Sequence, residues 1–338
     1  MKAIGARQSL PVTSPDCLIE FEAPAPTAGP QDVIVEISAV GVNPVDAKVR
    51  SSLGDAPLEE PRILGWDAAG TIVSVGAEVT EFQKGDEVFY AGDLTRPGSN
   101  AEFQAVDSRL IAKKPAAWTF GEAAALPLVT LTAWELLFER MGISPLGADQ
   151  GKALLIINGA GGVGSAMIPL AISAGLRVVA TASREESRAW CRNLGATDLL
   201  NHREPLRPQA EALGISEFPF IVNLHDTDSY WATTADLIAP LGTLGLIVEP
   251  KSALLLGDPL KAKCVRIAWE FMAARSKFQT PDMQRQGEIL TEIAARCEAG
   301  TFPKLGTHIF SGITAAHLRE AHAAMEKSNA LGKWVLEK

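Results

Sequence analysis

The residues with the clearest chemistry in this sequence are the glycines of INGAGGVGSA. Gly159, Gly161 and Gly164 form the pattern G-x-G-x-x-G. In a dinucleotide site the first glycine makes a tight turn, the second lets the backbone approach a pyrophosphate, and the third lets helix and strand pack closely. The N–H groups and positive dipole of a following helix would bind the phosphates. The predicted loop consists of Gly159, Ala160, Gly161, Gly162, Val163 and Gly164.

The flanking sequence favours this interpretation over a glycine turn with a purely structural role. An apolar strand is predicted at residues 153–157, an amphipathic helix at about 163–174 and a second strand at 176–181. Strand, glycine turn, helix and strand, in this order, form the context in which the motif binds a dinucleotide.

The residues after the second strand indicate which dinucleotide binds. An NAD site has Asp or Glu there, roughly 20 residues beyond the glycines, to bind the ribose 2′-OH. Here the sequence is TASR, residues 181–184, without an acid. A hydroxyl and a guanidinium suit a 2′-phosphate, so Ser183 and Arg184 are predicted to bind NADP(H). Ser183 and Glu186 also fit a capping box of the next helix, and both interpretations can hold together.

The elements that must position these residues fall into two groups. Up to about residue 120, β-branched runs such as DVIVEISAV and AGTIVSVG alternate with Gly and Pro, which is typical of a compact barrel or sandwich. Beyond about residue 125, strands alternate with helices, which indicates a parallel sheet covered on both faces. The predicted fold class is α/β, with a β-rich domain and a doubly wound parallel sheet.

Composition narrows the class of partner. The chain has 338 residues, enough for two domains. Its net charge of −9 disfavours nucleic acid or an anionic membrane as the main partner. No signal peptide or uninterrupted membrane span is predicted, so a cytoplasmic protein is expected. The four cysteines have no metal-site spacing, which favours free thiols.

With both domains outlined, the chain resembles the medium-chain dehydrogenase/reductase superfamily over nearly its full length. It is most similar to the quinone-oxidoreductase-like, zinc-type alcohol dehydrogenase-like branch. The residues that carry the resemblance include GVNPVDAKVR, RILGWDAAG, AAALPLVTLTAWE, GAGGVGS and SNALGKWVLEK. The resemblance implies a GroES-like catalytic domain at residues 1–124 and 300–338, a Rossmann NADP-binding domain at 125–299, and an active site in the cleft between them.

The resemblance also draws attention to a missing metal site. In zinc-containing relatives a His follows the glycine of the corner in ILGWDAAG, and a Cys stands at the position of Asn43. Here the corner carries Trp66, and residues 1–150 contain no histidine and one cysteine, Cys17. A catalytic zinc takes three protein ligands, mainly Cys and His. We therefore predict no metal, and expect Trp66 to form a wall of the substrate cleft. The alternative is ordinary core packing.

Without a Lewis acid, alcohol oxidation is difficult near neutrality, whereas hydride transfer from NADPH to a quinone or an α,β-unsaturated carbonyl compound needs no metal. The candidate catalytic groups are Asn43, Asp46, Trp66 and Tyr90. Asn43 and Asp46 also fit the N-cap and N3 positions of a short helix. In the family this helix opens into the cleft, so Asn43 could donate a hydrogen bond to substrate or to the nicotinamide ribose. Tyr90 could donate a proton or simply pack.

The resemblance implies further positions. Leu128 and Thr130 are expected near the nicotinamide and ribose, Leu224 and His225 near the adenosine, and Val248 near the nicotinamide. Asn329 and Lys333 are expected to reach the cofactor from the last segment. Trp269 and Phe271 are expected to close an apolar substrate cleft. The strand TLGLIV falls where family members form homodimers. The alternatives to a reductase are a low-activity NADPH-binding structural or regulatory protein and a zinc-dependent alcohol dehydrogenase.

Overall fold

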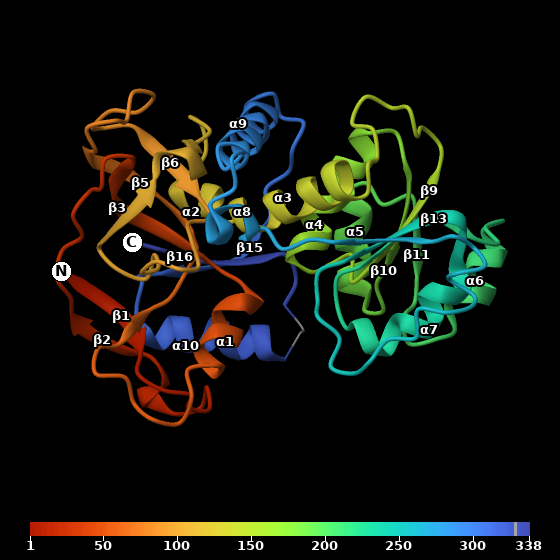
Figure 1. Ribbon diagram of the computed structural model, residues 1–338, viewed down its shortest axis with the longest axis horizontal. Helices are drawn as coiled ribbons and strands as arrows, with labels where there is room; N and C mark the ends of the chain where they lie inside the picture. The colour runs from red at the N-terminus through yellow and green to blue at the C-terminus, as the bar shows by residue number, and fades with distance from the viewer. Residues whose placement is uncertain (328–329) are drawn as a thin grey trace. The chain divides into compact units, whose positions relative to one another are not determined.

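The computed structural model describes the whole chain except residues 328–329. It divides into two compact units, Met1–Leu131 with Ala273–Lys338 and Thr132–Met272 (Figure 1). The first is β-rich and GroES-like and the second contains a parallel Rossmann-type sheet, which confirms the predicted fold class. The first unit therefore includes residues 273–299, which the sequence prediction assigned to the second.

The larger sheet of the first unit has the order β15-β16-β3-β5-β6-β8, and β7 also pairs with β3. The strands are β3 (Asp32–Val42), β5 (Asp67–Val75), β6 (Glu87–Tyr90), β7 (Phe103–Asp107), β8 (Ile111–Lys113), β15 (Gly306–Ser311) and β16 (Lys333–Glu337). The chain thus returns at its end, and β16 pairs antiparallel with β3. A smaller sheet has the order β2-β1-β4 and contains β1 (Lys2–Ala6), β2 (Ile19–Glu22) and β4 (Arg62–Ile63).

Helices close the first unit around an apolar core. They are η1 (Pro15–Cys17), α1 (Pro44–Ser51), η2 (Ser108–Leu110), α2 (Phe120–Ala124), α8 (Ala274–Phe278), α9 (Arg285–Glu298) and α10 (Ala315–Glu326), and α3 (Pro127–Trp134) runs into the second unit. Figure 1 shows α1 and α10, far apart in sequence, side by side. Val35, Ile37 and Leu336 are fully buried in the core between sheet and helices.

Gly287 explains why α9 belongs to the first unit. A Cβ at this position would lie 2.8 Å from the carbonyl oxygen of Arg109 and 2.9 Å from that of Ile111. Only a glycine lets α9 approach the backbone of β8 and η2 so closely. The periodicity of α9 does not show which unit it packs against, so the sequence prediction assigned it to the second unit.

The second unit is built on a six-stranded parallel sheet of order β11-β10-β9-β12-β13-β14. Its strands are β9 (Ala153–Ile157), β10 (Arg177–Thr181), β11 (Asp198–Leu200), β12 (Phe218–Asn223), β13 (Ile238–Leu246) and β14 (Arg266–Trp269). Its helical segments are η3 (Glu135–Arg140), α4 (Gly162–Ser173), α5 (Glu185–Asn193), α6 (Leu206–Ala212) and α7 (Thr227–Leu237). The strand order reverses between β9 and β12, which is where doubly wound folds bind their ligands.

Two sequence predictions about β13 and its neighbour β14 are corrected by the structure. β13 ends at Leu246, so Val248 lies beyond the strand that it was expected to end. The last strand in the order is β14, because Thr243–Leu246 pair in parallel with Arg266–Trp269. The strand TLGLIV is therefore internal. Strand periodicity shows that a segment is buried but not which neighbour covers it.

Within the described residues, one helical stretch, Phe120–Arg140, is long and apolar enough to span a membrane by composition alone. Of its most apolar window, 83% is buried inside the protein. This is the behaviour of a core helix in a globular domain.

Candidate functional site

The glycine loop between β9 and α4 turns at a residue that is not a glycine. Asn158 has a φ of 67°, in the left-handed region that Asn tolerates better than most residues. Its N–H donates to Thr181 Oγ1 at 2.9 Å, and the N–H of Gly159 donates to the Thr181 carbonyl at 3.3 Å. The end of β10 therefore holds the start of the loop. The sequence prediction gave the turn to Gly159 and missed Asn158.

Gly159 and Gly164 allow close packing. A Cβ on Gly159 would lie 2.7 Å from Ala180 Cβ, and one on Gly164 would lie 2.5 Å from the carbonyl oxygens of Asn158 and Gly159. Gly164 thus has the packing role that the motif predicts. α4 begins at Gly162, and the first N–H groups of a helix have no intrahelical acceptor. The residues present therefore fit a dinucleotide pyrophosphate.

Ser183 and Arg184 connect the end of β10, at Thr181, to α5. Ser183 is half-buried and Arg184 is exposed. The expected capping box of Ser183 and Glu186 is wrong, because Arg184 is the N-cap and its N–H donates to Ser187 Oγ at 3.2 Å. Since Ser187 caps the helix, the hydroxyl of Ser183 is not needed there. The segment therefore has a hydroxyl, on Ser183, next to a guanidinium, on Arg184, as predicted. No carboxylate side chain stands at the end of β10.

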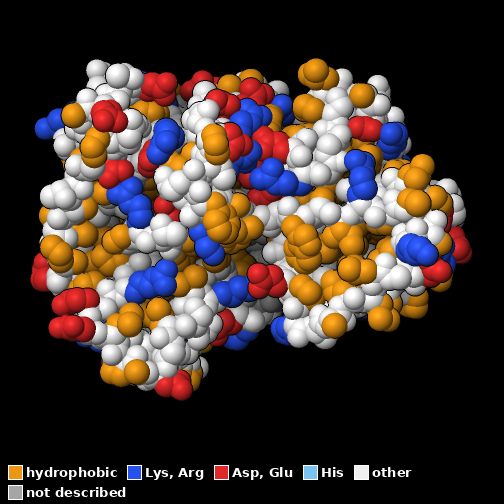
Figure 2. Space-filling model, in the orientation of Figure 1, with side chains coloured by type: hydrophobic (Ala, Val, Ile, Leu, Met, Phe, Trp, Pro, Cys, Tyr) orange, Lys and Arg blue, Asp and Glu red, His pale blue; other side chains and the backbone are white. Residues whose placement is uncertain are grey.

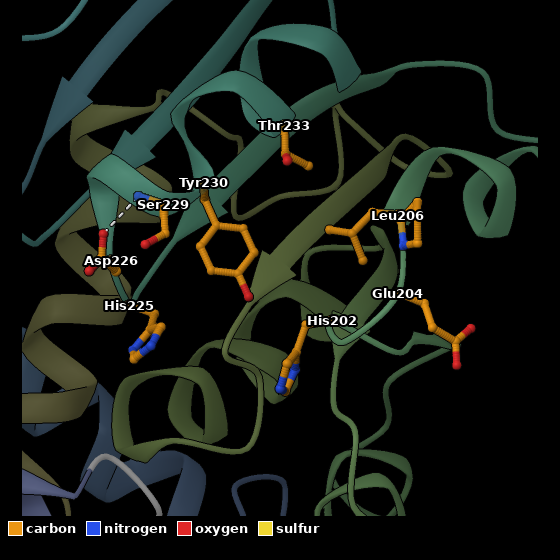
Figure 3. Close-up of a pocket in the computed structure, with 9 residues that line it drawn as sticks. His202, Glu204, Leu206, His225, Asp226, Ser229, Tyr230 and Thr233 are labelled. Carbon is orange, nitrogen blue, oxygen red and sulfur yellow. Dashed lines mark hydrogen bonds between the residues drawn. The ribbon is translucent and has the colours of Figure 1, made fainter.

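A pocket of about 430 Å³ lies at the carboxyl ends of β11 and β12 (Figure 3). It is lined by His202, Glu204, Pro205, Leu206, His225, Asp226, Ser229, Tyr230 and Thr233. Figure 3 shows the phenol ring of Tyr230 above the imidazoles of His202 and His225. The volume suits a small ligand, and the place is the carboxyl edge where doubly wound sheets bind nucleotides.

Leu224 and His225 follow β12 as the sequence predicts. The N–H of Leu224 donates to the carbonyl of Ile157, at the end of β9, at 3.3 Å. The N–H of His225 donates to Asn223 Oδ1 at 3.0 Å, which holds the turn that presents the imidazole to the pocket. The ring centroids of His225 and Tyr230 are 6.4 Å apart. Leu224 is buried next to the glycine loop, and His225 lines the pocket.

A second group of predicted site residues lies in the first unit, around a buried carboxylate, Asp67. Its Oδ1 accepts the N–H of Leu128 at the start of α3, at 2.6 Å. Its Oδ2 accepts the side-chain amide of Asn43 and the ammonium of Lys333, each at 2.8 Å. One side chain thus joins the starts of α1, α3 and β16. The sequence analysis did not name Asp67 as a site residue, and its only signal was an acid inside the apolar run ILGWDAAG.

Lys333 is buried to 2% exposure, and its ammonium is fully used. An ammonium has three donors, and here they meet Val42 O at 3.1 Å, Asn43 Oδ1 at 2.5 Å and Asp67 Oδ2 at 2.8 Å. The predicted role of Lys333 as a cofactor contact is therefore corrected. Its contacts give it a positioning role inside the first unit, where it fixes Asn43 and Asp67.

Asn43 and Asp46 form the predicted helix cap. Asn43 has the extended backbone of an N-cap, Pro44 is the first residue of α1, and Asp46 Oδ2 accepts the N–H of Asn43 at 2.5 Å. Because Lys333 and Asp67 bind the two ends of the Asn43 amide, this side chain is structural. Burial raises the pKa of Asp46 to about 7.

Trp66 and Tyr90 are core residues, and each is fully buried. The indole N–H of Trp66 donates to the carbonyl of Asp93 at 3.3 Å. The expectation that Trp66 walls the substrate cleft is therefore wrong, and the alternative of core packing holds. Burial raises the pKa of Tyr90 far above its ordinary value. A proton donor must reach substrate or water, so the structure does not favour a catalytic role for Tyr90.

The remaining predicted site residues have different outcomes in the structure. Thr130 is buried and its hydroxyl donates to the carbonyl of Leu126 at 2.9 Å, which argues against the expected cofactor contact. Asn329 lies outside the described residues. Trp269 and Phe271 are exposed at and beyond the end of β14, and their role at the substrate stays a prediction.

The corner at Gly65 does not fit zinc. Gly65 takes a φ of 93°, as the tight turn requires, but Trp66 and Asn43 stand where zinc-containing relatives have a His and a Cys. Among the described residues, no group of three or more His, Cys, Asp or Glu side chains is arranged to hold a metal. The cation in the polar cluster of this unit is the ammonium of Lys333.

The surface carries charges of both signs. On the face shown in Figure 2, acidic, basic and apolar side chains are interspersed, and no continuous basic area covers that face. This arrangement accords with the net charge of −9.

Comparison with known proteins agrees with this architecture. Residues 29–116 match the alcohol dehydrogenase GroES-like domain, and residues 194–336 match the zinc-binding dehydrogenase domain. A zinc-type alcohol dehydrogenase-like protein of Staphylococcus aureus (strain MSSA476) is 39% identical over 99% of each chain. A putative zinc-dependent alcohol dehydrogenase of Rhizobium etli CFN 42 is 42% identical, with a TM-score of 0.94 over 100% of this chain and 98% of the other.

A quinone oxidoreductase of Pseudomonas syringae pv. tomato DC3000 shares the same fold. It is 26% identical, with a TM-score of 0.82, over 99% of this chain and 100% of the other. A GroES-like unit joined to a Rossmann-type unit defines a two-domain oxidoreductase that uses a nicotinamide cofactor. The chain belongs to the medium-chain dehydrogenase/reductase superfamily, with the zinc-type alcohol dehydrogenase-like proteins.

Proposed function

We propose that the protein is a zinc-independent, NADPH-dependent reductase that transfers hydride to quinones or α,β-unsaturated carbonyl compounds. The observation that supports this most directly is the end of β10. Where an NAD site needs a carboxylate for the ribose 2′-OH, this chain has a half-buried Ser183 and an exposed Arg184. A guanidinium is the side chain best suited to a phosphate.

In this proposal the second unit binds the cofactor along the carboxyl edge of its sheet. Gly161 and the N-terminus of α4 bind the pyrophosphate, Arg184 with Ser183 binds the 2′-phosphate, and the pocket beside Tyr230 receives the adenosine together with this phosphate. When bound, NADPH supplies a hydride from its nicotinamide ring.

Zinc independence rests on the residues of the Gly65 corner. An alcohol needs a Lewis acid to lose its proton near neutral pH, and neither Trp66 nor Asn43 provides a zinc ligand. A quinone or an enone is already electron-poor and accepts hydride directly. Because Tyr90 and Asp46 are buried, we propose that the reduced oxygen takes its proton from water.

A direct assay separates this proposal from its alternatives. NADPH oxidation is followed at 340 nm with a panel of quinones and enones, with and without a chelator. We expect turnover that the chelator leaves unchanged. Metal-dependent turnover of alcohols would replace the proposal with a zinc alcohol dehydrogenase. Tight NADPH binding without oxidation across the panel would replace it with a binding protein.

We further propose that the protein acts on small molecules in the cytoplasm as a homodimer, without nucleic acid or membrane. The edge strand β14 supports a dimer, because an unpaired edge is a template for pairing with a second strand. Light scattering on the eluting protein tests this, and a monomer mass at micromolar concentration would contradict it.

A further inference from the structure

The pocket at the ends of β11 and β12 contains two histidines on separate elements. His202 follows β11 and His225 follows β12, so both side chains lie at the carboxyl edge of the sheet. Figure 3 shows the two imidazoles on the same side of the pocket, below the ring of Tyr230. The sequence analysis did not single out His202, since a lone histidine after a short strand gives no signal.

Charged residues surround this pair. Arg184, at the end of β10, and Arg203, next along the chain, act electrostatically on His202, as does His225. Glu204 and Asp226 also line the pocket. With neutral imidazoles, the two guanidinium groups are balanced by the two carboxylates, so the local charge is close to zero. A 2′-phosphate brings a charge of about −1.5 to −2 at pH 7.

The carboxylates are held by other partners. Asp226 Oδ1 caps α7 by accepting the N–H of Ser229 at 2.8 Å. Glu204 Oε1 accepts the side-chain amide of Asn201 at 2.9 Å. Neither group donates a hydrogen bond to a phosphate, and each opposes its negative charge. Histidine is the side chain that can gain positive charge near neutral pH, and in this pocket His202 is placed to do so.

We propose that His202 and His225, together with Arg184, form the subsite for the 2′-phosphate of NADP(H), and that cofactor binding there is coupled to uptake of a proton by His202. The proposal rests on the proposed function, because it assumes an NADP(H) site. It assigns His202 a role in choosing between NADPH and NADH. It also makes that choice depend on pH.

The starting state of the pair favours such coupling. Partial burial in the pocket, followed by the charges of Arg203, His225 and Arg184, lowers the pKa of His202 below its ordinary value. The free protein therefore holds this imidazole neutral at pH 7. A phosphate dianion beside the ring favours the imidazolium and reverses the shift. The proton taken up turns an acceptor nitrogen into a donor to the phosphate.

Calorimetric titration tests the proposal. The protein is titrated with NADPH or NADH at pH 7 in two buffers of different ionisation enthalpy, which gives the number of protons bound. We expect net uptake with NADPH and none with NADH. From pH 7 to 8, the Kd of NADPH should rise by up to about tenfold, the limit for one coupled proton, while the Kd of NADH changes little.

The variants His202→Asn and His225→Asn show where the proton goes. The 2′-phosphate has its own ionisation near pH 6, and this contribution is the same in wild type and variants. We expect His202→Asn to lose most of the uptake and to weaken NADPH binding about tenfold more than NADH binding, while an unchanged far-UV circular dichroism spectrum shows that the fold is intact. His225→Asn should keep the proton uptake and weaken NADPH binding only through the loss of an imidazole hydrogen bond to the phosphate.

Two results would distinguish failure of the histidine subsite from failure of the NADP assignment. Wild-type protein that prefers NADPH but takes up no proton, or a His202→Asn variant that keeps the full uptake, would overturn the histidine subsite and leave the reductase proposal standing. Wild-type protein that binds NADPH no more tightly than NADH would overturn the NADP assignment and the histidine subsite together.

Discussion

The ammonium of Lys333 lies 2.8 Å from the carboxylate of Asp67, and both side chains are buried. The pair joins the last strand of the first unit to the start of β5, across 266 positions of sequence. Asn43 and the backbone of Leu128 complete the set of hydrogen bonds. The cluster therefore organises the starts of α1 and α3, both of which the sequence analysis assigned to the active site.

Replacing Lys333 with Met should destabilise the first unit strongly. The change leaves Asp67 buried without its cation, and breaking a buried pair in this way costs about 3–5 kcal/mol. Urea unfolding followed by tryptophan fluorescence measures the loss. The double variant Lys333→Met with Asp67→Asn removes both charges and should recover a large part of it. A single variant as stable as wild type would show that the pair is not coupled.

Asp46 should make stability fall as pH rises towards neutrality. Burial raises its pKa from 3.8 to about 7, so between these values the unfolded state has lost a proton that the folded state keeps. The contribution is fully present below pH 3.8 and is lost as pH rises through about 7. The free energy of unfolding of Asp46→Asn, measured against wild type from pH 4 to 8, should gain most at the upper end. A difference independent of pH would contradict this.

His322 should have the opposite effect. It is buried beside Arg50, and, among the described residues, neither ring nitrogen has a hydrogen-bond partner. Burial first, and then Arg50, lower its pKa from 6.5 to about 3. The unfolded state therefore binds the extra proton in this window, and stability falls as pH decreases, by up to about 1.4 kcal/mol per pH unit.

The variant His322→Leu removes this dependence. Its free energy of unfolding relative to wild type should rise steadily as pH is lowered from 6.5 to 4, which separates the effect from that of Asp46. If both proteins lose stability in parallel over this range, His322 is protonated in the folded state and the prediction fails.

Gly164→Ala should disrupt the cofactor loop. The new Cβ would lie 2.5 Å from two backbone carbonyl oxygens, so the start of α4 must move away from β9. We expect NADPH affinity to fall about tenfold or more, read from the fluorescence of the bound nucleotide. Gly257→Ala is the matched control, because a Cβ there has no neighbour within 4 Å. Equal affinities in the two variants would show that the loop tolerates the movement.

Arg184→Ala should change the choice of cofactor. The side chain is exposed at the end of β10, and losing a charged hydrogen bond to phosphate costs about 1.5 kcal/mol or more. The KM for NADPH should rise about tenfold or more, while that for NADH stays nearly constant. Arg188→Ala, on the next turn of α5, is a suitable control. Equal effects of Arg184→Ala on both cofactors would remove the NADP assignment.

Short-range patterns predicted the second unit well. The strand at 153–157 and the α4 helix lie where the glycine motif placed them, because the motif and its flanks are contiguous in sequence. The turn residue Asn158 escaped prediction, since a positive φ at a residue other than glycine has no pattern of its own. Val248 was placed in a strand because the apolar run continues beyond Leu246, where pairing ends.

Long-range contacts decided the rest. Trp66 was expected to wall the cleft because it stands where zinc-containing relatives have a His, but its burial depends on strands that pack over it. Lys333 was expected at the cofactor because the family resemblance brings the last segment of the chain there. Its partner, Asp67, is conspicuous in ILGWDAAG. Nothing local connects two such charges, so the sequence could indicate each one but not their pairing.

The connectivity of the first unit has a consequence for how the protein is made. Residues 132–272 are inserted between its two segments, and Lys333 is the first residue of β16. During synthesis on the ribosome, all strands of the inserted unit are made before Lys333, the ion-pair partner of Asp67, is added to the chain. The inserted unit can therefore fold while the first unit still lacks β16. A stop codon before residue 333 would leave the buried carboxylate of Asp67 without its cation.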